Sequence, residues 1–194
     1  MSTAPEHADQ LRRLAAVMHR LRRECPWDAR QTHRSLVTHL IEETGEVVDA
    51  IEIGTDDDLR EELGDLLLQV YFHAEIAAEE GRFTLDEVAS EVADKLIRRH
   101  PHVFGEGEPP QDVLAVWESI KRSEKGRTSS LDGIAESLSS IARATKVISR
   151  ARRHQVPLEL SDEAISADEV GHRIIALVAR AQASGVDADQ ATRE

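Results

Sequence analysis

The sequence predicts an all-α protein, and two observations lead to that prediction. Apolar residues recur every three or four positions over most of the 194 residues, which is the spacing of one helix face. Aromatic residues make up 3% of the chain, and runs of alternating Val, Ile and Thr, which are typical of strands, do not occur. A chain of this length can bury one sizeable core, so we expect a helical bundle.

The first helices are placed by this spacing and by residues that start or stop helices. One is expected at about 6–24, before a loop with the sequence CPWD. Two more are expected at about 33–53 and 57–80, with the breaker Gly54 between them and Asp56 as the N-cap of the second. Because so few residues join these two helices, they should pack as an antiparallel hairpin.

The later helices follow from the same signals. Thr84 precedes Glu87 by three residues, which is the spacing of a capping box and predicts a helix at about 84–99. Further helices are expected at about 111–124, 134–153 and 167–184.

Acidic residues gather on the apolar side of the two hairpin helices. Glu43 and Glu46 share a helix face, and so do Glu62 and Asp65, because positions three or four apart lie on one side. Carboxylates are rarely buried unless they are paired or bind a metal. Four of them in an apolar interior would repel one another, and a hard cation such as Mg2+ removes that repulsion.

A simpler interpretation of this pattern is a solvated face. Most acidic pairs at helical spacing lie in water and form pairs with basic residues one turn away. Here the acids follow the apolar stripe on both helices, and Arg60 is the one basic residue close to them in sequence. These two observations favour a metal site.

Composition excludes some classes of protein. The chain has 24 basic and 37 acidic side chains, a net charge of −13, which argues against nucleic-acid binding. We expect neither a signal peptide nor a membrane span, and the single Cys25 suits the reducing cytoplasm. The helix at 57–80 is apolar around most of its circumference, and one chain offers few helices to cover it. We therefore expect a homodimer, or a dimer of dimers, to complete the bundle.

The motifs resemble those of MazG nucleoside triphosphate pyrophosphohydrolases. The pair EExxE and ExxD carries the resemblance, together with segments in matching order: CPWDARQTH, EELGDLLLQVYFHA, EEGRFTL, DKLIRRHPHVFG and WESIK. It implies an all-α MazG domain over residues 1–155, followed by a helical extension of unknown role at 156–194. It also implies Mg2+-dependent hydrolysis of nucleoside triphosphates to monophosphates and pyrophosphate, as nucleotide house-cleaning.

The resemblance implies roles for individual residues. Glu43, Glu46, Glu62 and Asp65 would hold Mg2+, with Mn2+ as a substitute, and Glu42 is a candidate general base beside them. Candidate substrate contacts on the phosphates and the base are Lys95, Arg98, Arg99, Trp117 and Lys121. The ordinary alternative is that the basic residues interact with helix C-termini and that the tryptophan is a core residue.

Other observations leave alternatives open. A family pattern places lysines one turn before each metal motif, where this chain has His39 and Asp58. A catalytically weak regulatory module that binds nucleotide or protein is therefore one alternative, and a dUTPase-like hydrolase of the same fold is another. The CPWD turn is expected to seat Trp27, with a base-pocket role as a second interpretation. A single ExxH pair, Glu169 and His172, is too little for a di-iron site.

Overall fold

The computed structural model describes residues 4–105, 112, 113, 116, 117, 120, 124, 129, 131–161 and 163–193. These residues form helices, turns and loops, and no strand occurs among them, as the sequence predicts. The chain divides into two compact units, Met1–Pro109 and Pro110–Glu194. No helix in the described part of the chain is both long and apolar enough to cross a membrane.

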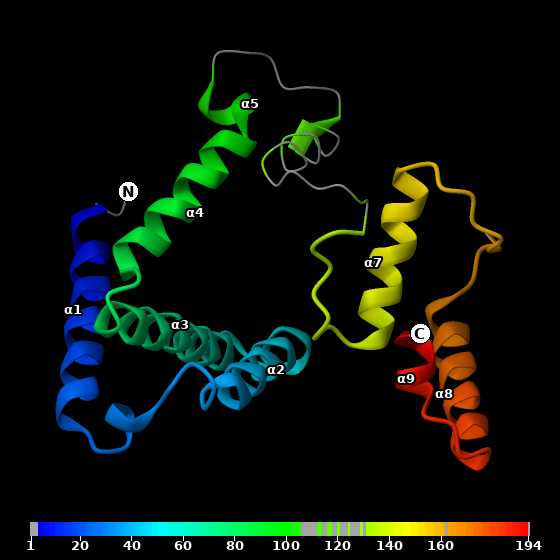
Figure 1. Ribbon diagram of the computed structural model, residues 1–194, viewed down its shortest axis with the longest axis horizontal. Helices are drawn as coiled ribbons and strands as arrows, with labels where there is room; N and C mark the ends of the chain where they lie inside the picture. Colours follow the sequence, from blue (N-terminus) through cyan, green and yellow to red (C-terminus); the bar gives the residue numbers. More distant parts are fainter. Residues whose placement is uncertain are drawn as a thin grey trace. The chain divides into compact units, whose positions relative to one another are not determined.

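The first unit is built around one central helix. Its elements are α1 (Ala4–Glu24), the 3-10 turn η1 (Asp28–Arg30), α2 (Val37–Ile53), α3 (Asp56–Glu79), α4 (Leu85–Arg99) and α5 (Pro101–Phe104). The helices α2 and α3 run side by side as the predicted hairpin (Figure 1). Both α1 and α4 also pack against α3. The helix predicted at 57–80 is therefore the one against which α1, α2 and α4 all pack.

The buried core lies along the C-terminal half of α3. Its members come from α1, from the loop before α2 and from α3, and they are Met18, Leu36, Tyr71, Phe72 and Ile76. Met18 and Leu36 are each 1% exposed. In the N-terminal half of α3, by contrast, Leu63 remains 50% exposed. The two halves of α3 therefore differ: one half anchors the core, and the other keeps apolar surface in contact with solvent.

Reciprocal capping boxes begin both α3 and α4. Thr55 caps α3 and accepts a hydrogen bond from the backbone N–H of Asp58, while the Asp58 side chain accepts one from the backbone N–H of Thr55. The expectation that Asp56 is the N-cap is wrong, because the threonine has the extended backbone that a capping box needs. At α4 the predicted box of Thr84 and Glu87 is confirmed.

The second unit contains α7 (Ser140–Arg153), α8 (Ala167–Ala183) and α9 (Ala188–Arg193). Both α7 and α8 pack against α9. The helix predicted at 134–153 begins later than expected, because Ser139 caps it by accepting a hydrogen bond from Ala142. The prediction for 167–184 is confirmed to within a residue. The helix expected at 111–124 falls largely outside the described residues.

Candidate metal centre

Three carboxylates from the hairpin converge on one point. Glu43 comes from α2, and Glu62 and Asp65 come from successive turns of α3. Each offers one oxygen atom, and the three oxygens all lie within 4.8 Å of one another. All three residues are half-buried. The packing of α2 on α3 therefore produces an oxygen-rich group of the kind that binds hard divalent cations.

Electrostatic strain accompanies this convergence. Burial raises the pKa of Glu43, and the charges of Asp65 and Glu46 raise it further. The pKa of Glu62 is also raised, first by desolvation and then by the charges of Glu46 and Asp65. Arg60, the nearest basic residue in sequence, pairs with Asp57 at 2.8 Å, and both of those side chains are exposed. The cluster therefore carries the mutual repulsion that a bound cation would relieve, so these residues fit one.

Glu46 stands apart from this group. It is exposed and is not among the three carboxylates that converge. Its charge still raises the pKa values of Glu43 and Glu62, so it acts on the cluster electrostatically. The expectation of four acids in an apolar interior is thus corrected: the structure gathers three half-buried acids, with the fourth exposed beside them. The Glu46 side of the cluster is therefore open to solvent.

Glu42 and an aromatic wall border the cluster. Glu42 is exposed, and its Oε2 lies 3.3 Å from Nδ1 of His39, one turn earlier on α2. The His39 ring meets the edge of Trp27 with ring centroids 6.0 Å apart. Trp27 also meets Phe72 edge-on at 6.3 Å, and 48% of its own surface is exposed. The CPWD loop therefore places a half-exposed indole beside the helix turn that carries Glu42 and Glu43.

None of the predicted substrate contacts comes from the α2–α3 hairpin. Lys95 is half-buried, Arg98 is exposed and Arg99 is buried, all on α4, which packs against α3. Trp117 is half-buried in the second unit. Lys121 lies outside the described residues. The structure thus brings the acids together and leaves the substrate contacts as separate predictions.

Gln69 is a polar residue to which sequence reasoning assigned no role. It lies one turn beyond Asp65 on α3 and is 5% exposed. Its Oε1 is buried and accepts no hydrogen bond from any described residue. A buried amide oxygen without a donor is uncommon. The signal in the sequence was an amide inside the apolar run LLLQVYF, on the face shared with Glu62 and Asp65.

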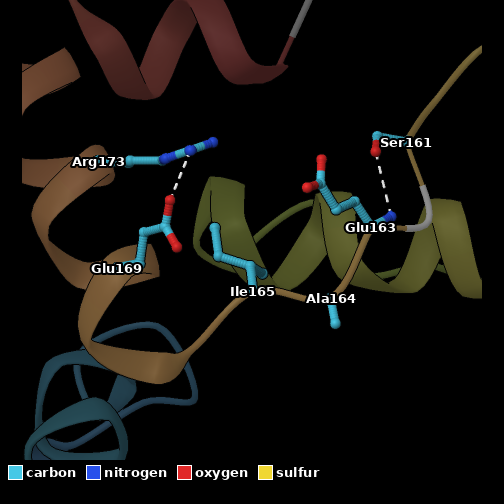
Figure 2. Close-up of a pocket in the computed structure, with 6 residues that line it drawn as sticks. All are labelled: Ser161, Glu163, Ala164, Ile165, Glu169 and Arg173. Atoms are coloured by element: carbon cyan, nitrogen blue, oxygen red, sulfur yellow. Dashed lines mark hydrogen bonds and ion pairs between the residues drawn. The ribbon is translucent and has the colours of Figure 1, made fainter.

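Glu169 of the ExxH pair lines a depression in the second unit (Figure 2). The depression measures about 250 Å³ and lies between α8 and the loop before it. Glu169 is paired there with Arg173 at 2.5 Å, one turn along α8. His172 instead lies 2.9 Å from the backbone oxygen of Asp168. Glu169 and His172 therefore each interact with a residue one turn away on α8.

Comparisons with known proteins agree with the geometry. Residues 31–104 match the model of the MazG nucleotide pyrophosphohydrolase domain. The chain is also 44% identical over 182 residues to an uncharacterized 26.1 kDa protein of Streptomyces cacaoi, covering 91% of this chain and 74% of that protein. The chain belongs to the MazG family. All the acidic candidates of this MazG chain, Glu42 included, lie inside the matched range.

Named MazG relatives are longer than this chain. The nucleoside triphosphate pyrophosphohydrolase of Escherichia coli K12 is 47% identical over 150 residues, which cover 73% of this chain and 57% of that enzyme. The Mycobacterium tuberculosis enzyme of the same name is 44% identical over 171 residues, covering 84% of this chain and 53% of its own length. The chain therefore spans little more than half of each.

A solved MazG structure shares the fold. The crystal structure of a MazG-related protein from Thermotoga maritima superposes with a TM-score of 0.51 at 27% identity. It covers 57% of this chain and 98% of that protein. The predicted all-α MazG fold is thus confirmed.

Proposed function

We propose that this chain hydrolyses nucleoside triphosphates to nucleoside monophosphates and pyrophosphate in a metal-dependent reaction that clears standard or damaged nucleotides. The observation that carries the proposal is the meeting of the Glu43, Glu62 and Asp65 oxygens within 4.8 Å. The names of the E. coli and M. tuberculosis relatives support the same activity.

Mg2+ is the proposed cofactor, and Mn2+ is expected to substitute for it. The residues that would hold it are Glu43, Glu62 and Asp65, with Glu46 joining from the open side. When bound, such an ion neutralises phosphate charge and lowers the pKa of a water that it binds. Glu42 is the proposed general base, because it is exposed beside the cluster and its partner His39 orients it.

The triphosphate also needs positive charge from the protein. Lys95, Arg98, Arg99 and Lys121 are the proposed phosphate contacts, and Trp117 is the proposed base contact. All five residues lie within the DKLIRRHPHVFG and WESIK segments that resemble MazG.

A homodimer is proposed for the assembly, in the cytoplasm, with residues 1–155 as the catalytic domain. An apolar stripe on α2 favours it, because its side chains remain 42–67% exposed: Val37, Ile41, Val48 and Ile51. Leu63 on α3 adds to this surface. Light scattering at low micromolar concentration tests it, and a folded monomer of 21.6 kDa would contradict it.

Product analysis tests the activity. A panel of nucleoside triphosphates is incubated with Mg2+, with and without EDTA, and the products are separated. Monophosphate and pyrophosphate that disappear with EDTA support the proposal. Diphosphate and inorganic phosphate contradict it. Nucleotide binding without turnover would favour the regulatory alternative, for which the argument is that His39 and Asp58 stand where the family pattern has lysines.

A further inference from the structure

One buried arginine holds the loop between α1 and α2. Arg22, near the end of α1, is 8% exposed. Its Nε donates to Oε1 of Glu79 at 2.9 Å, and one terminal nitrogen donates to Oε2 of the same carboxylate at 2.5 Å. The other terminal nitrogen donates to the backbone oxygens of Asp28 and, at 3.0 Å, Gln31. The guanidinium therefore joins the last turn of α3 to both sides of η1.

The held segment carries Trp27. The two carbonyls that Arg22 binds belong to residues one and four positions after this tryptophan. Gln31 also donates from its amide nitrogen to the backbone oxygen of Trp27 at 3.0 Å. The Arg22 guanidinium lies 5.7 Å from the centre of the Phe72 ring, on which Trp27 packs. The arginine thus fixes both the backbone around Trp27 and one ring beside it.

Trp27 connects this clamp to the candidate metal centre. Its indole meets His39, and His39 lies beside Glu42. The charge of His39 also acts on Glu43, where it lowers the pKa against the other influences. Displacement of the loop would move the indole away from the turn of α2 that carries these acids.

We infer that Arg22 is a positioning residue, which holds Trp27 as a wall of the nucleotide site by joining Glu79 to the backbone of the CPWD loop. The inference rests on the proposed function for its kinetic consequence but not for its structural one. Lysine cannot replace this arginine, since an ammonium has no planar fork to bind a carboxylate in two places while reaching two carbonyls.

The structural consequence is measured without substrate. In a Trp117→Phe background Trp27 is the one tryptophan of the chain, so its fluorescence reports its exposure. Arg22→Lys should shift the emission to longer wavelength and increase quenching by acrylamide. Arg20→Lys is the matched control, because Arg20 lies on the same helix in an exposed pair with Glu24 and should leave both signals unchanged.

The kinetic consequence is measured as a double-mutant cycle. Arg22→Lys and Trp27→Ala should each raise KM, by roughly ten- to a hundredfold for a misplaced contact surface, with a smaller change in kcat. If the arginine acts through the tryptophan, the double variant should be no worse than Trp27→Ala alone. Glu79→Gln, which removes the charge that binds Arg22 and keeps the shape, should show a smaller effect of the same kind.

Assays are run where circular dichroism shows each variant to be folded. Unchanged Trp27 quenching in both Arg22→Lys and Glu79→Gln would overturn the inference. Multiplying effects in the cycle would also overturn it, because they would mean that Arg22 supports the fold independently of Trp27. If the wild-type chain turns over no nucleotide, the proposed function is contradicted. The quenching result would still show whether Arg22 keeps Trp27 in place.

Discussion

The imidazole rings of His33 and His73 are parallel to within 2°, with their Nδ1 atoms 2.8 Å apart. The guanidinium of Arg82 contacts Nε2 of His33. Because an arginine can only donate, that nitrogen accepts, and His33 must carry its proton on Nδ1. This proton is then donated to Nδ1 of His73, so the contact requires both rings to be neutral. Burial lowers the pKa of His73, and the nearby His33 lowers it further.

The first prediction is a loss of stability in mild acid. The pKa of His73 is lower in the folded than in the unfolded chain, so between the two values the unfolded chain binds more protons. The free energy of unfolding should therefore fall as the pH drops below about 6.5, the value of an unperturbed histidine, and should level off above it. Urea unfolding from pH 5 to 8 measures this.

The control compares two histidine substitutions. His73→Gln should flatten the slope just below pH 6.5, whereas His172→Gln should not, because His172 is exposed on α8. Equal slopes for the wild type and the His73 variant would contradict the protonation pattern.

The second prediction separates metal ligands from structural acids. Burial, and then repulsion by neighbouring acids, raises the pKa of Glu43, so the folded chain binds more protons than the unfolded one above pH 4.5. Metal-free stability should therefore fall as the pH rises through the folded pKa. Glu43→Gln or Asp65→Asn should remove part of that loss, raise the metal-free Tm and abolish Mg2+-dependent turnover.

Added Mg2+ should raise the Tm of the wild type, since it binds the folded chain, and should raise the Tm of these variants less. Glu52→Gln, an exposed change on the same helix, serves as control and should respond to Mg2+ like the wild type. An amide variant that is less stable without metal yet keeps full turnover would rule out a metal site at these acids.

The third prediction concerns the phosphate contacts on α4. Lys95→Ala should lower kcat/KM by roughly ten- to a hundredfold, because a charge-assisted hydrogen bond is worth about 1.5–3 kcal/mol. Lys146→Ala, an exposed change on α7, should leave the kinetics unchanged. Steady-state kinetics with saturating Mg2+ measure both. Wild-type values for the Lys95 variant would mean that Lys95 makes no contact with phosphate.

The fourth prediction concerns the unpartnered oxygen of Gln69. A buried acceptor without a donor destabilises a fold by about 1–3 kcal/mol. Gln69→Leu keeps a similar volume and removes that oxygen, so it should raise the metal-free Tm. Gln69→Ala is the contrast, because it opens a cavity and should lower the Tm. A lower Tm for the leucine variant would mean that a solvent molecule already satisfies the amide.

Much of the fold could be predicted from the sequence, because it depends on local signals. The hairpin follows from the short Gly54 connection, and the capping box at Thr84 follows from spacing alone. The cap at Thr55 was missed by one residue, because Asp56 and Thr55 are both good N-cap residues and backbone angles decide between them. The short helices α5 and α9 were missed as well, since single turns carry almost no periodic signal.

In the candidate site as well, local features could be predicted and contacts between distant residues could not. Helical spacing predicted that Glu62 and Asp65 would share one face of their helix and that Glu43 would lie on the apolar face of the other, and the oxygens of all three meet. Spacing could not predict that Glu46 would be exposed, because this depends on how α2 is rotated against α3. The Arg22–Glu79 clamp was also beyond reach, since 57 residues separate its members and no motif marks the pair.

Asp58 takes part in the capping box at Thr55, so a substitution at this position affects the start of α3 as well as the site. Asp58 lies one turn before Glu62, where the family pattern has a lysine. Its carboxylate accepts from the Thr55 N–H and hydroxyl, both at 2.7 Å, and these bonds lower its pKa. A lysine there would bring a cation toward the triphosphate but would remove the acceptor that begins α3. Asp58→Lys should therefore lower the thermal stability and raise the substrate affinity. At this position, folding and catalysis favour different residues.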